Sequence, residues 1–286
     1  MVPNPVLSFN LFGKEFSVYL YGVCIAVGLL ACIFVFYYYT NKKKVPTKMQ
    51  DFVFFIAIIS IAIGFLFAKL YQAFYDYLGT GVFDFYGAGM TVMGGLIGGA
   101  GAFLLVYFLG GKLIFKNKEK DLHIKYFNDV LLVAPICITI AHAFGRLGCL
   151  MSGCCHGAYL GKKYVFGGIW MRAPDTGMTG YHVPTQLYEA LFLFALFAVL
   201  TVLYFKRCNI LLHIYLIAYG VWRFIIEFIR TDAVGVVGGD LFRPSQWQSF
   251  VFVSIGIALI IFYVIKKIPI WLKTDKEEIE KQETKE

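Results

Sequence analysis

The sequence predicts an all-α polytopic membrane protein of about seven transmembrane helices, with the N-terminus outside and the C-terminus in the cytoplasm. The first observation is composition: 59% of the 286 residues are hydrophobic and 15% are charged, with a mean hydropathy of +0.70. Soluble domains average about 45–50% apolar and 25% charged residues. Because a water-soluble fold could not bury this much apolar surface, we expect the chain to lie in a lipid bilayer.

The second observation is the length of the apolar runs. A hydrocarbon core about 30 Å thick requires roughly 20 apolar residues per helix. Seven stretches meet this requirement, at residues 16 to 39, 52 to 77, 91 to 109, 129 to 150, 186 to 205, 210 to 230 and 246 to 265. They form a single integral membrane domain, residues 1–272, and leave residues 273–286 as a charged cytoplasmic tail.

The third observation is the placement of Lys and Arg, which mark cytoplasmic loops. They follow every odd-numbered span: Lys42, Lys43, Lys44 and Lys48 after the first, five lysines from Lys112 to Lys125 after the third, Lys206 and Arg207 after the fifth, and Lys266 and Lys267 after the seventh. Residues 78 to 90, on the opposite side, contain neither Lys nor Arg. These loop anchors explain the net charge of +8, so we expect no nucleic-acid binding.

Ionisable side chains inside the spans point to a functional site. Each costs at least about 2.5–3.5 kcal/mol to insert, so a functional role is the first hypothesis. The residues are Lys69, His142, Arg146, Glu189, His213, Arg223 and Glu227. With the predicted orientation, all but His142 and His213 fall toward the outer ends of their helices, as do Tyr21, Gly94, Gly95 and Gln246. We therefore predict a polar site at the outer membrane face.

The cations of this set suit an anionic phospholipid headgroup. Arginine presents a planar fork that binds phosphate through two hydrogen bonds, and Lys69 would add a third cation to Arg146 and Arg223. Arg223, Glu227 and Arg230 recur at spacings of four and three, so they share one helical face. The alternative is a purely structural ion pair between Arg223 and Glu227.

A glycine- and cysteine-rich segment surrounds Arg146. Residues 141–157 read AHAFGRLGCLMSGCCHG, which places Gly145, Gly148, Gly153 and Gly157 around the arginine. Glycine at this density lets the backbone approach a ligand and exposes amide donors to an anion.

The same segment contains Cys149, Cys154 and Cys155, for which several roles are open. The spacing lacks the separated CxxC pair of common zinc sites, so we expect no metal. A disulfide is consistent with the oxidising outer face, and a thiolate activated by Arg146 or His156 is another role. Packing alone is the simplest role.

Six motifs resemble, in order, those of the prolipoprotein diacylglyceryl transferase family. They are VYLYGVCIAVG (18–28), AKLY (68–71), GGLIGG (94–99), GRLGCLMSGCCHG (145–157), VPTQLYEA (183–190) and YGVWRFIIEFIR (219–230). The resemblance implies transfer of the diacylglyceryl group from phosphatidylglycerol to the lipobox cysteine thiol of a prelipoprotein, at the outer face of the bacterial cytoplasmic membrane. It also implies seven spans with the N-terminus outside and the C-terminus inside. We expect no cofactor.

The resemblance also assigns roles to residues. Arg146 and Arg223 would bind the phosphate, Glu227 would hold Arg223 in register, and Tyr21 would line the pocket. The expected catalytic set is Arg146, Arg223, Glu227, His142 and Cys149. The expected substrate-binding set is Tyr21, Lys69, Gly94, Gly95, Gly148, Gly153, Cys154, Cys155, Gly157, Gln186, Tyr188, Glu189 and Arg230.

Three positions depart from the family pattern. Met93 stands where the family has a histidine before the glycine turn, Cys149 replaces an asparagine, and Lys69 replaces an arginine. Because methionine cannot accept a proton, we expect another base, with His142 and His156 as candidates. The alternatives are a core histidine for His142 and an exposed loop residue for His156.

The missing histidine keeps rival functions open. One is a paralogue that uses the same lipid donor with a different acceptor. Another is a lipid-binding or thiol-redox membrane protein without transferase activity. Within the transferase hypothesis, the attacking thiol belongs either to the prelipoprotein or transiently to Cys154 or Cys155.

Overall fold

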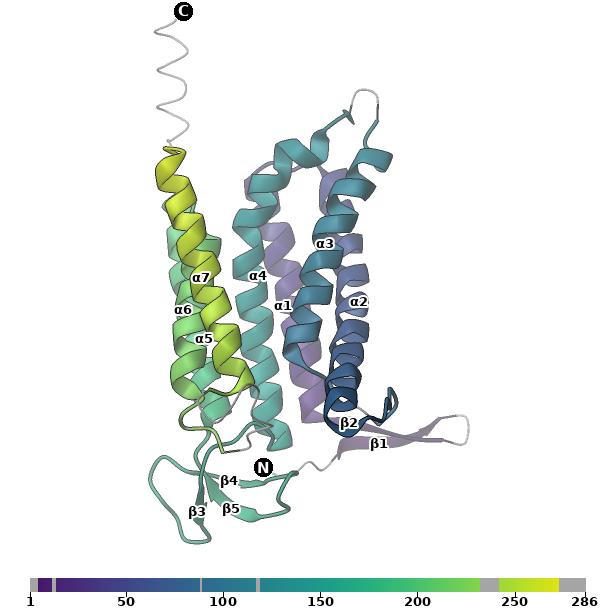
Figure 1. Cartoon of the computed structure of the whole chain (residues 1–286), viewed down its shortest axis with the longest axis vertical. Coiled ribbons are helices and arrows are strands. Elements are labelled where there is room, and N and C mark those ends of the chain that lie inside the picture. Colours follow the sequence, from purple (N-terminus) through teal and green to yellow (C-terminus); the bar gives the residue numbers. More distant parts are fainter. Residues whose placement is uncertain (1–4, 12–13, 88, 117–118, 232–241, 273–286) are drawn as a thin grey trace, which may run out of the picture. The chain divides into compact units, whose positions relative to one another are not determined.

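The computed structural model describes residues 5–11, 14–87, 89–116, 119–231 and 242–272, and these contain seven helices (Figure 1). The helices are α1 (Leu20–Lys42), α2 (Thr47–Thr80), α3 (Val92–Ile114), α4 (Leu122–Ser152), α5 (Thr185–Phe205), α6 (Leu211–Ile226) and α7 (Pro244–Ile265). Six are long and apolar enough to cross a membrane, and α6 is a shorter apolar helix of 16 residues. The chain is therefore a polytopic, mainly helical membrane protein, as predicted.

The boundaries of several helices differ from the prediction. The sixth span was expected to reach residue 230, but α6 ends at Ile226. Helices α2 and α4 are longer than their apolar runs, with 34 and 31 residues. Hydropathy identifies the part of a helix that suits lipid, whereas hydrogen bonding continues into the polar ends.

The described residues also form two small antiparallel β-sheets, neither of which was predicted. Strands β1 (Pro5–Leu11) and β2 (Lys14–Tyr19) form a hairpin, so α1 begins at Leu20 and not at residue 16. Strands β3 (Tyr159–Gly161), β4 (Ile169–Arg172) and β5 (Thr179–His182) form a sheet in the order β3-β5-β4 between α4 and α5. Strands β3, β4 and β5, of three or four residues each, are too short to show an alternating apolar pattern.

The chain divides into two compact units. Unit 1 contains Met1–Phe36 and Leu131–Glu286, and unit 2 contains Tyr37–Val130. In unit 1, α5, α6 and α7 run alongside one another (Figure 1). In unit 2, α2 packs along α3.

Glycines set the close approach of neighbouring helices in both units. In unit 2, a Cβ at Gly94 would lie 2.5 Å from the carbonyl oxygen of Phe67 and 2.6 Å from Cβ of Tyr71. In unit 1, a Cβ at Gly220 would lie 3.1 Å from the carbonyl oxygen of Ser249. Small residues let membrane helices pack backbone to backbone, where lipid tails provide no hydrophobic drive for association.

We predict that Gly94→Val destabilises the protein by about 1–3 kcal/mol, because the added side chain would force α2 and α3 apart. The measurement is thermal unfolding in detergent. Gly101→Val is the matched control on the same helix, since a Cβ at Gly101 meets no atom within 4 Å. Equal shifts for the two variants would mean that helix propensity, and not packing, causes the loss.

Candidate functional site

Glu189 lies at the centre of a buried charge network in unit 1. It projects from the first turns of α5, and only 2% of its surface is exposed. One carboxylate oxygen, Oε2, lies 3.1 Å from Nε of Arg146 on α4 and 3.9 Å from Nη1 of Arg223 on α6. The other, Oε1, accepts a hydrogen bond of 3.1 Å from the hydroxyl of Tyr219. A buried carboxylate requires such partners, so three helices are joined at this residue.

His142 belongs to the same network. It lies one turn before Arg146 on α4, and its Nε2 accepts a hydrogen bond of 3.3 Å from Nε of Arg146. The same nitrogen lies 3.9 Å from Oε1 of Glu189. The ring centre is 5.0 Å from that of Tyr219. His142 therefore contacts Arg146, a predicted phosphate-binding residue, and its Nε2 already accepts a hydrogen bond.

Glu227 forms a second centre at the end of α6. Its Oε2 lies 3.0 Å from Nη2 of Arg223 and 3.7 Å from Nη1 of Arg230. A third cation, Arg243, lies 3.8 Å from Oε1 of Glu227 and donates hydrogen bonds to the carbonyl oxygens of Glu227 (3.1 Å) and Arg230 (2.8 Å). Arg243 directly precedes α7, so it fastens the start of α7 to the end of α6.

This network carries more positive than negative charge. Its guanidinium groups are Arg146, Arg223, Arg230 and Arg243, and its carboxylates are Glu189 and Glu227. Among the described residues, Arg146, Arg223 and Arg243 alone outnumber the two carboxylates, so the network has an excess of positive charge. Within the described residues, the buried Nη1 of Arg223 has no hydrogen-bond partner. An anion with oxygen acceptors would satisfy both the excess charge and this donor.

The segment after α4 is fastened to the same end of unit 1. The amide of Gln186 donates to the carbonyl oxygen of Cys154, and Oγ1 of Thr185 donates to that of Cys155 at 2.5 Å. The nitrogen of Gly157 donates to the carbonyl oxygen of Val183 at 2.9 Å. These bonds tie residues 154–157 to the chain that enters α5, one turn before Glu189.

Glycines in this segment are required by close contacts. Gly153 has a φ of +75°, and Gly157 pairs with Arg230 in an isolated β-bridge, where a Cβ would lie 2.8 Å from the carbonyl oxygen of Ile229. At Gly148, a Cβ would lie 3.2 Å from the ring of Tyr21. Gly153 and Gly157 thus allow the segment to pack closely against its neighbours. Gly148 leaves room for the ring of Tyr21 to pack against α4.

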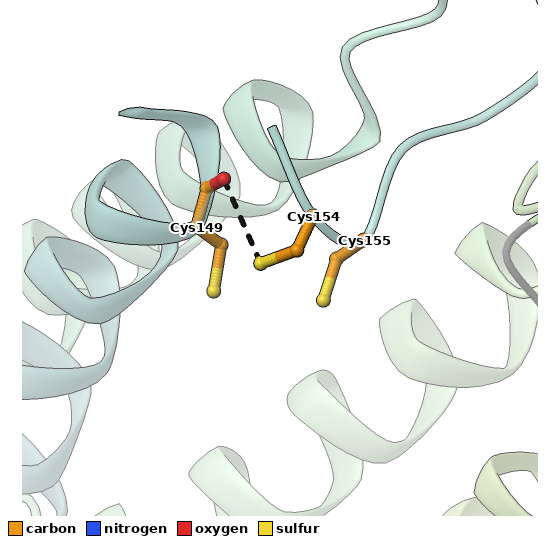
Figure 2. A group of neighbouring side chains, drawn as sticks. All are labelled: Cys149, Cys154 and Cys155. Carbon is orange, nitrogen blue, oxygen red and sulfur yellow. Dashed lines mark hydrogen bonds between the residues drawn. The ribbon is translucent and has the colours of Figure 1, made fainter. Parts of the chain in front are cut away.

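The three clustered cysteines lie beside Arg146 in the sequence and come together in space. The sulfur atoms of Cys149, Cys154 and Cys155 all lie within 4.8 Å of one another, and Figure 2 shows the three side chains converging. All are free thiols and half-buried. The hydroxyl of Ser152 lies 3.1 Å from Sγ of Cys154. The cluster is the second chemical feature of this end of unit 1.

His156 is buried, so the view of it as an exposed loop residue is wrong. Only 3% of its surface is exposed. Its Nε2 lies 3.0 Å from Oδ1 of Asp175, and its Nδ1 lies 2.9 Å from the carbonyl oxygen of Gly157. The bond to His156 lowers the pKa of Asp175, and burial lowers the pKa of the neighbouring His182. His156 therefore ties the segment after α4 to the connection between β4 and β5, and both of its ring nitrogens are engaged.

The structure brings together part of the predicted site. Arg146, Arg223, Glu227, His142, Glu189 and Arg230 form one network. Tyr188 instead donates a bond of 3.4 Å to the carbonyl oxygen of Gly167. Lys69, Gly94 and Gly95 belong to unit 2, where Lys69 donates to the carbonyl oxygen of Tyr86 at 3.2 Å, so their role at the site stays a prediction.

Tyr219 and Arg243 are network members that the sequence analysis did not assign. Tyr219 is one of 19 tyrosines, and only its position one turn before Arg223 on α6 marks it. Arg243 was detectable as a cation directly before the Pro-Ser-Gln that opens the last span.

We predict that Glu189→Gln destabilises the protein by about 3–5 kcal/mol, because it leaves two buried guanidinium groups without their carboxylate. Thermal unfolding in detergent measures the effect. The control is Glu119→Gln, which breaks an exposed ion pair with Lys48 and should cost less than about 1 kcal/mol. A Glu189→Gln variant as stable as wild type would show that the network is not electrostatically coupled.

Comparison with known proteins gives one family. The prolipoprotein diacylglyceryl transferase family matches residues 7–262. Two relatives are named phosphatidylglycerol-prolipoprotein diacylglyceryl transferase. The one from Clostridium tetani (strain Massachusetts / E88) is 32% identical to this chain, over 89% of this chain and 95% of the relative. The one from Streptococcus pneumoniae (strain Taiwan19F-14) is 31% identical, over 90% of this chain and 94% of the relative.

Proposed function

Because the chain belongs to the prolipoprotein diacylglyceryl transferase family, we propose that it transfers the diacylglyceryl group of phosphatidylglycerol to the lipobox cysteine thiol of prelipoproteins. The observation that carries this proposal is the network of four guanidinium groups and two carboxylates. Its positive excess suits the phosphodiester of an anionic lipid, and so does Nη1 of Arg223, which has no hydrogen-bond partner among the described residues.

The proposed roles follow from the contacts. Nη1 of Arg223, which has no hydrogen-bond partner among the described residues, would donate to a phosphate oxygen, while Glu227 lies 3.0 Å from Nη2 of the same guanidinium. Arg146 supplies the second cation from α4. Glu189 keeps the two arginines at a fixed separation, since both approach its Oε2. Tyr21, beside Gly148, would contact the lipid where it enters.

The proposed reaction is a displacement at the glyceryl carbon that carries the phosphate. The acceptor thiol releases its proton to water, and its sulfur forms a bond to this carbon as the carbon–oxygen bond breaks. Glycerol phosphate leaves with the electron pair, and the negative charge that grows on the leaving oxygen is stabilised by the arginines. Positioned cations of this kind are most effective where water is excluded.

We propose that the site faces the outside of a bacterial cytoplasmic membrane. Within unit 1, the network lies at the end of α4, the start of α5, the end of α6 and the start of α7, whereas Lys206, Arg207, Lys266 and Lys267 follow the opposite ends of α5 and α7. A green fluorescent protein fused after residue 286 should fluoresce in cells, and alkaline phosphatase at the same place should be inactive. An active phosphatase together with a non-fluorescent fusion would show that the C-terminus lies outside, which contradicts the proposed orientation.

We predict that Arg223→Lys lowers kcat/KM for diacylglyceryl transfer by roughly 10- to 150-fold, the equivalent of about 1.5–3 kcal/mol for a charge-assisted hydrogen bond. Lysine keeps the charge that Glu189 and Glu227 require but cannot reproduce the planar fork. The assay uses purified protein, phosphatidylglycerol vesicles and a lipobox peptide, with thioether product detected by mass spectrometry.

Two controls accompany this assay. Arg172→Ala removes an exposed arginine of β4 and should leave turnover unchanged. Phosphatidylcholine vesicles, which lack net negative charge, should give no product. Unchanged turnover for Arg223→Lys would overturn its role as a phosphate ligand. Lipid binding by the wild-type protein without peptide modification would favour a different acceptor or a non-catalytic function.

A further inference from the structure

We propose that Cys149, Cys154 and Cys155 form a binding site for a thiophilic divalent cation of the zinc class, with a fourth coordination position open to an external thiol. The inference rests on the proposed function only for the identity of that thiol, which would be the acceptor cysteine. It departs from the sequence-based expectation of no metal, because that expectation rested on the linear spacing of the cysteines and not on their positions in space.

The sulfur positions suit a metal ion. All three Sγ atoms lie within 4.8 Å of one another, and the side chains converge on one space (Figure 2). With zinc–sulfur bonds of about 2.3 Å, tetrahedral angles place sulfurs about 3.8 Å apart. The sulfurs therefore need to approach one another by about 1 Å at most. Small rotations of the side chains can supply this.

The backbone explains how a C-x₄-C-C spacing produces a cluster. Cys149 lies on the last turn of α4, which ends at Ser152. Gly153, with a φ of +75°, and Cys155, with a φ of +60°, reverse the chain. Cys154 returns far enough for its Sγ to donate to the carbonyl oxygen of Cys149 at 3.7 Å. Two residues with positive φ, Gly153 and Cys155, thus replace the short CxxC loop of common zinc sites.

The cluster is held in place before any ligand binds. The carbonyl oxygens of Cys154 and Cys155 are fixed to α5 by the side chains of Gln186 and Thr185. The hydroxyl of Ser152 lies 3.1 Å from Sγ of Cys154 and donates to the carbonyl oxygen of Cys149 at 3.0 Å. Hydrogen bonds to coordinating atoms orient them and tune metal affinity. A site fixed in this way loses little conformational entropy on binding.

The charges are compatible with three thiolates. Three thiolates and a divalent cation leave one negative charge. Arg146 lies three residues before Cys149 on α4, so both occupy neighbouring positions on the helix surface. Among the described residues, the guanidinium network to which Arg146 belongs has an excess of positive charge. This excess offsets part of the negative charge of a metal site made of thiolates.

Three protein ligands leave a position that an external thiol can fill. Zinc prefers four ligands, and an open fourth position is typical of catalytic sites. A thiol that coordinates there loses its proton to water and is held as a thiolate. In the transfer, this sulfur bonds to the glyceryl carbon while the carbon–oxygen bond to phosphate breaks. No electrons are exchanged with the metal, and glycerol phosphate carries away the electron pair.

The first experiment uses Co²⁺ as a spectroscopic substitute for zinc. Full-length protein purified in detergent under a non-chelating reductant is stripped of metal and titrated with Co²⁺. We expect one equivalent to bind with a thiolate-to-cobalt charge-transfer band and the visible bands of tetrahedral cobalt, and zinc to displace it. Replacing Cys149, Cys154 or Cys155 by Ser should weaken binding by at least about 10-fold, since even loss of a ligand's hydrogen-bond partner costs roughly 10–100-fold.

Cys24→Ser is the matched control, because Cys24 is also a half-buried thiol on a helix of unit 1 and lies outside the cluster. It should leave the titration unchanged. Absence of the charge-transfer band would overturn the proposal. So would a disulfide between two of the three cysteines as the form isolated from cells without added oxidant, since it leaves too few thiolates.

The second experiment tests the open position. A lipobox peptide, or a small thiol, should shift the visible cobalt bands, whereas the same peptide with Ser in place of Cys should not. If the thiol does not shift the cobalt bands, the metal has a structural role and the proposal of an open coordination position is wrong. Loss of lipid transfer with the cobalt response intact would count against the proposed function alone, which separates the two failures.

Discussion

The buried carboxylate of Glu189 is the interaction on which unit 1 depends. Apolar contacts alone do not drive helices together in lipid, because acyl chains are as apolar as leucine. A carboxylate without partners in this environment would be very costly, so Arg146, Tyr219 and Arg223 must be present on α4 and α6 for α5 to keep Glu189. The arrangement of three helices at this end of the unit is thereby specified by charge.

The same charges that specify the fold leave the site prepared for an anion. Glu189 and Glu227 neutralise only part of the cationic charge of the four arginines. Each arginine that a carboxylate holds has lost its rotational freedom before a lipid arrives. Binding a phosphate then requires no further ordering of the side chains, which is the main advantage of a preorganised site. The same ion pairs therefore stabilise the fold and prepare the site for the ligand.

The sequence allowed the helices and most of the network to be predicted, for a definite physical reason. Long apolar runs identify membrane spans clearly. An ionisable residue inside a span costs so much free energy to insert that its presence indicates a function. Arg146, Glu189, Arg223 and Glu227 were found in this way. The β3–β5 sheet and the burial of His156 depend on contacts between short polar segments, which leave no periodic signal. Arg243 was not assigned from the sequence, because its hydrogen bonds to the end of α6 are evident only in the structure.

The remaining chemical question is how an acceptor thiol would lose its proton. Nε2 of His142 accepts a hydrogen bond from Arg146, and both ring nitrogens of His156 are engaged by Asp175 and Gly157. A cation held by thiolates would stabilise the deprotonated thiol directly, and it needs no proton acceptor among the side chains. Because Nε2 of His142 and both ring nitrogens of His156 are engaged, we favour activation of sulfur by coordination over activation by a histidine base.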